Sequence, residues 1–349
     1  MDATLLTRPA FWSEPEEVFF ETSGSSGIPK QVAISKQALL VSAAAVNAHL
    51  GVTADSCWGL ALPLHHVGGF GVAARAYAAG CRFAQFEKRW DARDFQEWLE
   101  RNRVSHTSLV PTQVHDLVGA HLACPASLVA IVVGGGQLDA ATGQAARALG
   151  WPVLASYGMT EAASQIATQG PAALEALYQP APIPLLPIWE ARTDANGLLE
   201  ITGPALFSGY LGSGKFTPRE GGWHLTSDRV LLDGRDLTPL GRADRLVKIL
   251  GELVDPEAIE RELVALSEGG LAPGSFAVVP IPDPRAGFIL IPFFPVSASL
   301  PAIECALAHY RSRAPGFRRL GSPVMLEDFP LSDLGKPRRA ELAARFQRP

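Results

Sequence analysis

The sequence contains few cysteines, and none of them are spaced as a metal site requires. Its four cysteines are far apart, and no CxxC motif occurs among Cys57, Cys81, Cys124 and Cys305. A zinc site needs closely spaced ligands, and a disulfide framework is typical of small secreted domains. The sequence therefore predicts neither, and we expect the thiols to be inert and mostly buried.

Long apolar runs and an excess of basic residues are also missing. No apolar run approaches the roughly 20 residues that span a bilayer, and the N-terminal residues lack the basic start and apolar core of a secretory signal. The formal net charge of -5 argues against a protein that mainly neutralises nucleic-acid phosphates. We expect a cytoplasmic protein without membrane insertion and without a nucleic-acid partner.

The sequence does show short apolar runs that alternate with helix-like stretches. Ser35, Asp91 and Asp139 stand where they can cap helices between these runs. The runs that read as buried strands are 57–64, 81–86, 104–110, 128–133 and 152–155. This alternation predicts an α/β fold with mainly parallel, helix-flanked sheets, whose ligand loops follow the carboxyl ends of the strands.

The pattern changes toward the C-terminus, and 349 residues are enough for two domains. After Gly197 come short strands and turns, and Asp255 can then cap a helix that has Pro256 at its first position. We expect a large domain over 1–243 and a small α+β domain over 244–349.

A loop rich in glycine and hydroxyl side chains follows the strand-like Val18-Phe19-Phe20. It reads Thr22-Ser23-Gly24-Ser25-Ser26-Gly27-Ile28-Pro29-Lys30. The glycines let backbone N–H groups turn toward an anion, the hydroxyls add donors and the lysine adds charge, so the loop suits a polyphosphate. It lacks the spacing of nucleotide-triphosphatase loops. Taken alone, it could also be a flexible turn that joins a strand to a helix.

This loop and several later segments resemble, in the same order, the acyl- and aryl-adenylate-forming (AMP-binding) superfamily, which includes the acyl-CoA synthetases. The later segments are 62–69, 134–138, 157–161, 223–228, 241–260 and 330–336. The resemblance implies a ligase that joins a carboxylic acid to a thiol through an acyl-adenylate, with ATP, Mg²⁺ and coenzyme A. It also implies that the second domain moves and carries the catalytic lysine. The family usually has a substantial subdomain before the loop, which here begins at residue 22.

The resemblance assigns roles residue by residue. It implies that the nucleotide is bound by Thr22, Ser23, Gly24, Ser25, Ser26, Gly27, Lys30, Gly134, Gly135, Gly136, Tyr157, Gly158, Thr160, Asp228 and Arg242. The implied catalytic residues are Lys336, Glu161, Thr160 and His66, and Glu161 is also the implied Mg²⁺ ligand. The resemblance further implies that Asp244 is the hinge between the domains and that Lys248 and Gly251 line the coenzyme A tunnel. The ordinary alternatives are a solvated Lys336, a structural His66 and a surface pair of Asp228 with Arg242.

The acid pocket is assigned to His66, Gly69, Arg75 and Thr112. The run Arg75-Ala76-Tyr77-Ala78-Ala79-Gly80 and the run Ser108-Leu109-Val110-Pro111-Thr112-Gln113 resemble the o-succinylbenzoate:CoA ligases of menaquinone biosynthesis. A cation in the small, apolar stretch around Arg75 needs an anionic partner, which a second carboxylate of the substrate would supply. An internal salt bridge is the alternative.

Two other functions fit the same residues. A stand-alone adenylation enzyme would load a carrier protein instead of coenzyme A, and a non-catalytic protein would only bind a nucleotide or an acyl-adenylate. The set of Lys30, Glu161, Asp228 and Lys336 favours catalysis, because binding alone does not require all four charges. An oligomer is compatible with the sequence.

Overall fold

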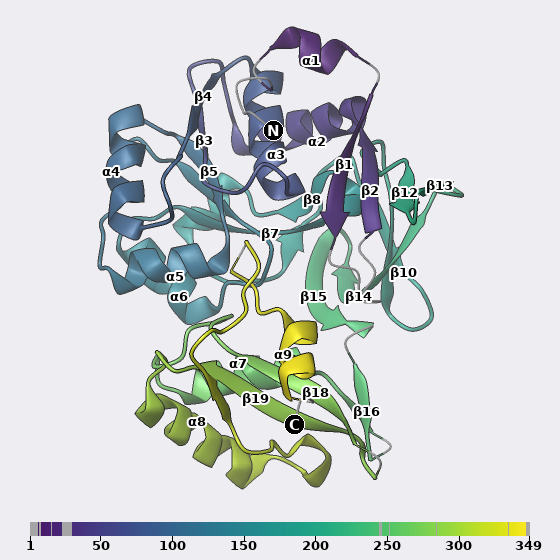
Figure 1. The fold of residues 1–349 in the computed structure, drawn as a ribbon. Helices are drawn as coiled ribbons and strands as arrows, with labels where there is room; N and C mark the ends of the chain where they lie inside the picture. Colours follow the sequence, from purple (N-terminus) through teal and green to yellow (C-terminus); the bar gives the residue numbers. More distant parts are fainter. Residues whose placement is uncertain are drawn as a thin grey trace. The chain divides into compact units, whose positions relative to one another are not determined.

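A computed structural model of the chain describes residues 6, 8–14, 16–22, 30–243, 246–250, 252–283, 285–333 and 335–346 (Figure 1). The chain divides into two compact units, Met1–Leu240 and Gly241–Pro349, each with its own hydrophobic core. The sequence predicts the boundary between these units after residue 243. No helix in these ranges is both long enough and apolar enough to cross a membrane.

The first unit is built on a six-stranded sheet in the order β4-β3-β5-β6-β7-β8, in which only β8 runs antiparallel to its neighbour. The strands are β3 (Cys57–Leu60), β4 (Arg82–Gln85), β5 (His106–Leu109), β6 (Ala130–Val133), β7 (Val153–Met159) and β8 (Ser164–Thr168). Both β3 and β5 are buried throughout, as expected for strands covered on both faces. The predicted α/β class is confirmed.

Helices flank this sheet, and the predicted caps begin three of them. Ser35 caps α2 (Lys36–Leu50), Asp91 caps α4 (Ala92–Asn102) and Asp139 caps α6 (Ala140–Ala148), each by accepting backbone N–H bonds. Two further helices are α3 (Val67–Ala79) and α5 (Pro111–Gly119). In Figure 1, α4, α5 and α6 lie together, and α2 packs against α3.

Two further sheets of the first unit are antiparallel. One has the order β1-β2-β12-β13 and the other β10-β11-β14-β15-β9. The hairpins between β12 and β13 and between β14 and β15 are too short for a helical crossover, so these strands pair antiparallel. The elements are α1 (Pro9–Ser13), β1 (Glu17–Thr22), β2 (Lys30–Ser35), β9 (Ile183–Pro184), β10 (Glu190–Thr193), β11 (Leu198–Thr202), β12 (Gly209–Gly212), β13 (Lys215–Pro218), β14 (His224–Asp233) and β15 (Asp236–Arg242).

The second unit is an α+β unit with a sheet in the order β18-β19-β20 and a separate β16-β17 hairpin. Successive residues of a strand face opposite sides of its sheet. On β18, Val278 therefore joins one core with α7 and α8, whereas Ala277 and Val279 join another with Leu342 of α9. The elements are β16 (Val247–Ile249), β17 (Glu252–Val254), α7 (Pro256–Leu266), β18 (Ala277–Asp283), β19 (Gly287–Pro295), α8 (Leu300–Arg313), β20 (Val324–Leu326) and α9 (Arg339–Phe346).

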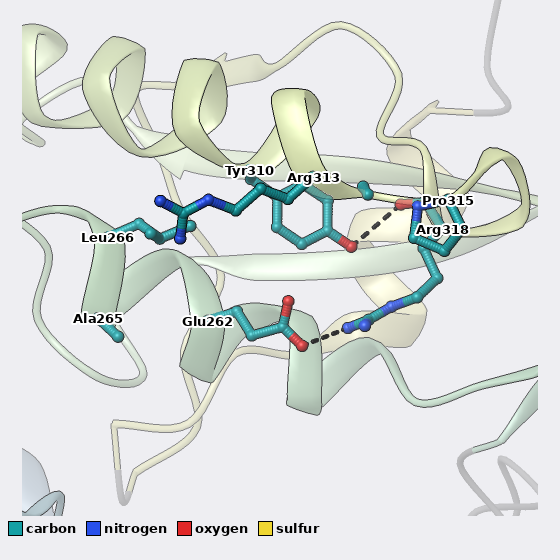
Figure 2. A pocket seen from close by; sticks show the side chains of 8 residues that line it. Glu262, Ala265, Leu266, Tyr310, Arg313, Pro315 and Arg318 are labelled. Carbon is teal, nitrogen blue, oxygen red and sulfur yellow. Dashed lines mark hydrogen bonds and ion pairs between the residues drawn. The ribbon is translucent and has the colours of Figure 1, made fainter.

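A surface pocket of the second unit lies between α7 and α8 (Figure 2). Arg318 donates to Glu262 at 2.5 Å, and the Tyr310 hydroxyl donates to the Arg318 carbonyl at 3.1 Å. Burial raises the pKa of Tyr310 to about 12, so this hydroxyl keeps its proton at neutral pH. These contacts hold the chain after α8 against α7, and we assign the pocket no chemistry.

Candidate functional site

The predicted adenine-side glycines lie at the carboxyl edge of the parallel sheet. Gly134, Gly135 and Gly136 directly follow β6. A Cβ on Gly134 would lie 3.1 Å from Ser156 Oγ, and one on Gly135 would lie 3.4 Å from Val110, which follows β5. The structure therefore brings the loops after β5 and β6 together beside β7, as expected for ligand loops at the ends of parallel strands.

The segment of Thr112 belongs to the same edge. Thr112 is half-buried at the second position of α5. The side chain of Gln113 accepts a bond from Val110 N at 3.0 Å and donates to the Ala61 carbonyl at 3.2 Å. Gln113 thus ties the start of α5 to the segment that leads from β3 to His66.

His66 and Gly69 shape the start of α3. His66 is half-buried at the N-cap, where its carbonyl accepts the Phe70 N–H at 2.9 Å, and its ring lies 4.4 Å from that of His65 between centroids. A Cβ on Gly69 would lie only 2.2 Å from the Pro63 carbonyl oxygen. The missing side chain of Gly69 therefore has a packing reason, because the backbone of the preceding loop occupies that space.

Tyr157 and Asp228 connect the parallel sheet to the antiparallel sheet that contains β14. The Tyr157 hydroxyl donates to Asp228 Oδ2 at 2.5 Å, and Asp228 N donates to Thr226 Oγ1 at 3.1 Å. Gly158 lies in a bulge of β7, where a Cβ would come within 1.6 Å of the Ser164 carbonyl oxygen. Only glycine fits there, so Gly158 places the chain against the next strand.

Thr160 and Glu161 follow β7 in a single 3₁₀ turn, Thr160–Ala162. The Tyr210 hydroxyl donates to Glu161 Oε1 at 3.1 Å, and burial together with the Glu161 charge raises the pKa of Tyr210. Burial lowers the pKa of the nearby His224, which keeps that ring neutral at pH 7. A half-buried carboxylate beside the Tyr210 hydroxyl oxygen offers hard oxygen ligands, and it fits Mg²⁺.

Arg75 is almost completely buried, with 2% of its surface exposed. It donates from Nη1 to Ser108 Oγ at 3.0 Å and from Nη2 to Ser164 Oγ at 3.4 Å, and it lies 5.1 Å from the Trp58 ring centroid. Burial lowers its pKa to about 9, so the guanidinium is still charged at neutral pH. In the part of the chain that the structure describes, no carboxylate forms an ion pair with it.

Three predicted site residues that the structure describes come after Leu240, where the first unit ends. Arg242 ends β15, and Lys248 is exposed on β16. Lys336 is exposed in a tight turn, in which its N–H donates to Ser332 Oγ at 3.1 Å and its carbonyl accepts from Ser332 N at 2.7 Å. Gly335 completes this turn with a φ of 71°.

Other predicted residues lie outside the described part of the chain. These are Ser23, Gly24, Ser25, Ser26, Gly27, Asp244 and Gly251. Thr22 and Lys30 are paired with each other at the ends of β1 and β2. The glycine-rich loop therefore connects two antiparallel strands, and the alternative of a link from strand to helix was wrong.

Several residues that contact the predicted site residues or lie near them in the chain were missed by the sequence analysis. Ser164 contacts Arg75, and Tyr210 contacts Glu161. In the second unit, Arg339 donates to Glu260 at 2.8 Å and to Glu257 at 3.2 Å, three residues beyond Lys336. No local pattern marked them, because their partners come from distant parts of the sequence.

The chain belongs to the AMP-binding enzyme family, whose sequence model matches residues 16–211, more than half of the chain. It is 31% identical to a 2-succinylbenzoate–CoA ligase of Escherichia coli, over 70% of this chain and 51% of that protein. It is 29% identical to a ligase of the same name from Enterococcus faecalis, over 78% of this chain and 58% of that protein. The chain thus spans little more than half the length of these relatives.

Solved structures agree with this assignment. One is the o-succinylbenzoate CoA synthetase (MenE) of Bacillus subtilis in complex with the acyl-adenylate intermediate OSB-AMP. It has a TM-score of 0.77 and 25% identity, over 93% of this chain and 68% of that one. The same enzyme in complex with ATP and a magnesium ion gives a TM-score of 0.76 and 26% identity, over 93% of this chain and 69% of that one. The predicted membership of the adenylate-forming superfamily is confirmed.

Proposed function

We propose that this protein is an ATP-dependent acid:CoA ligase that acts through an acyl-adenylate on an acid with two carboxylates, most simply o-succinylbenzoate. Membership of the AMP-binding family supports the adenylate chemistry. The names of its relatives and the ligands of the similar structures support this acid and a place in menaquinone biosynthesis. The cytoplasmic location expected from the sequence is part of the proposal.

The observation that carries the choice of acid is the environment of Arg75. Burying a charged group without a charged partner is costly, and native proteins almost always pair such a group. Here two serine hydroxyls orient the guanidinium, and none of the described acidic side chains neutralises it. The internal salt bridge that the sequence left open is therefore not formed among those residues. A guanidinium has five N–H donors, so it can hold both serines and also receive a carboxylate.

The adenylation step follows from the remaining groups. The acid's other carboxylate attacks the α-phosphorus of ATP, a bond forms between them, and pyrophosphate leaves with the electron pair of the broken P–O bond. In this proposal Asp228, oriented by Tyr157, accepts hydrogen bonds from the ribose hydroxyls. Glu161 holds Mg²⁺, which offsets the charge of the phosphates. Lys336 supplies positive charge where the two anions meet.

The second step releases AMP. The thiolate sulfur of coenzyme A attacks the acyl carbon, the bond between that carbon and the phosphate oxygen breaks, and AMP carries away the negative charge. Lys248 belongs to the segment that the family resemblance assigns to the coenzyme A tunnel. Neither step requires a covalent intermediate on the protein.

The test is a ligation assay with a panel of acids and two acceptors. We expect AMP, pyrophosphate and a coenzyme A thioester from o-succinylbenzoate, with much lower rates for benzoate and for medium-chain fatty acids. Transfer to a carrier protein and not to free coenzyme A would identify the other adenylating function. If no acid in a broad panel supports exchange between ATP and pyrophosphate, the proposed activity is wrong.

A further inference from the structure

The turn from Thr160 to Ser164 joins the proposed metal ligand to the residue that contacts Arg75. Ala163 has a φ of 49° and Ser164 a φ of 101°. Residues other than glycine rarely adopt positive φ, and two in succession make a costly backbone. Such strain persists only where the surrounding structure holds it in place.

Three contacts hold this turn. The Ser42 hydroxyl donates to the buried Ala163 carbonyl at 3.0 Å. The backbone of Gly158 lies directly against the Ser164 carbonyl, where a Cβ would come within 1.6 Å. The third contact is the bond of 3.4 Å from Arg75 Nη2 to Ser164 Oγ. Of the three, only the last comes from the group that would receive the acid.

The other end of the turn is fixed just as closely. The Glu161 carbonyl accepts the Phe207 N–H at 2.8 Å, and its carboxylate accepts the Tyr210 hydroxyl at 3.1 Å. The Ala163 N–H donates to the Thr160 carbonyl at 3.1 Å, which closes the turn. Because Glu161 and Ser164 belong to the same short turn, we expect a change in how Ser164 is held to reach Glu161 through the backbone.

We propose that Ser164 is a positioning residue that couples recognition of the acid to binding of the magnesium–nucleotide complex. This inference rests on the proposed function. A carboxylate on Arg75 fixes the guanidinium, whose bond to Ser164 then stabilises the strained turn and with it the position of Glu161. Because binding free energies are linked reciprocally, the acid tightens nucleotide binding by the factor by which the nucleotide tightens acid binding.

The chain offers a matched control for this inference. Ser108 accepts a bond from the same guanidinium, but it lies on β5, outside the turn. Ser108→Ala should therefore weaken acid binding and leave the coupling unchanged. Ser164→Ala removes the hydroxyl and keeps the strained backbone, whereas Ser164→Gly removes the hydroxyl and also accommodates the positive φ.

The experiment is calorimetric and needs no turnover. The Kd of the protein for the Mg²⁺ complex of α,β-methylene-ATP is measured with and without saturating o-succinylbenzoate. This analogue cannot transfer its adenylyl group, because a carbon atom joins its α- and β-phosphorus atoms. Couplings between sites are typically about 5- to 150-fold. We expect a wild-type ratio in that range, an unchanged ratio in Ser108→Ala, and a ratio at least about threefold smaller in both Ser164 variants. We also expect Ser164→Gly to unfold at a higher denaturant concentration than Ser164→Ala.

The possible failures are distinguishable. If the wild type binds no dicarboxylate acid, the proposed function and this inference fall together. If the wild type shows coupling and both Ser164 variants keep it, or if Ser108→Ala loses as much as Ser164→Ala, only the inference is overturned. Because glycine adopts positive φ freely, Ser164→Gly gives an answer even where Ser164→Ala does not fold.

Discussion

The Tyr157 hydroxyl donates a hydrogen bond to the Asp228 carboxylate across 2.5 Å. Tyr157 lies at the end of the parallel sheet and Asp228 in the middle of β14, so this bond joins two separate sheets of the first unit. It also orients the carboxylate that we expect to bind the ribose of the nucleotide.

Asp228→Asn should raise the KM for ATP by about 10- to 100-fold, because a hydrogen bond to a charged group contributes about 1.5–3 kcal/mol. Tyr157→Phe leaves the charge in place and should have a smaller effect of the same sign. Both are measured in the exchange of pyrophosphate into ATP. Asp233→Asn, at the exposed end of the same strand, is the control. If Asp233→Asn raises the KM for ATP as much as Asp228→Asn does, the assignment of Asp228 to the ribose is wrong.

Gly69→Ala should lower the free energy of unfolding by about 1–3 kcal/mol, the usual cost of overpacking. The added methyl group would lie 2.2 Å from the Pro63 carbonyl oxygen, which belongs to the backbone and cannot move away cheaply. Gly68→Ala is the control, because its nearest neighbour is a Leu62 methyl group at 3.7 Å. Denaturant unfolding of both variants measures the difference, and equal stabilities would contradict this account of Gly69.

Stability should depend on pH through His106, which is 3% exposed on β5 and whose pKa is lowered by burial. As the pH falls below about 6.5, the unfolded state takes up this proton before the folded state does, so the folded state loses stability. His106→Gln removes this contribution, which is at most about 1.4 kcal/mol per pH unit. The unfolding free energies of the wild type and of His106→Gln should therefore change with different slopes between pH 5 and 7. Parallel curves for the two proteins would argue against a neutral His106.

Lys336→Ala should separate the two half-reactions. We expect pyrophosphate release to fall by at least about 100-fold, as when a group that stabilises transition-state charge is lost. Thiolysis of preformed acyl-adenylate should stay within about threefold of wild type, because that step no longer brings the carboxylate and phosphate anions together. Equal losses in both steps would show that Lys336 does not act in adenylation alone.

Local sequence signals predicted much of the fold. Ser35, Asp91 and Asp139 begin their helices because capping depends on side chains next to the helix itself. Helix α3 was not predicted, since His66 gives it no side-chain cap and glycines open its first turn. Its stability comes from burial against the sheet, which no local pattern records.

Sequence patterns singled out some residues of the candidate site, and the other residues around it depend on tertiary contacts. The sequence singled out Arg75 but could not exclude an internal salt bridge, because its partners Ser108 and Ser164 lie on other elements. The strain of the turn before β8 was equally hidden, since Ala163 and Ser164 are not residues that favour positive φ. The antiparallel pairing of the other two sheets depends on short hairpins. The sequence predicts strands and turns there, but not which strands pair.

The central claim is that Arg75 receives the carboxylate that does not react. The direct measurement is kcat/KM for adenylation of o-succinylbenzoate and of two analogues that each keep one carboxylate, 4-oxo-4-phenylbutanoate and 2-butanoylbenzoate, by the wild type and by Arg75→Met. We predict that the wild type prefers the dicarboxylate by about 10- to 100-fold over whichever analogue reacts, and that Arg75→Met reduces this preference to within about threefold. A preference that Arg75→Met retains in full would contradict the account.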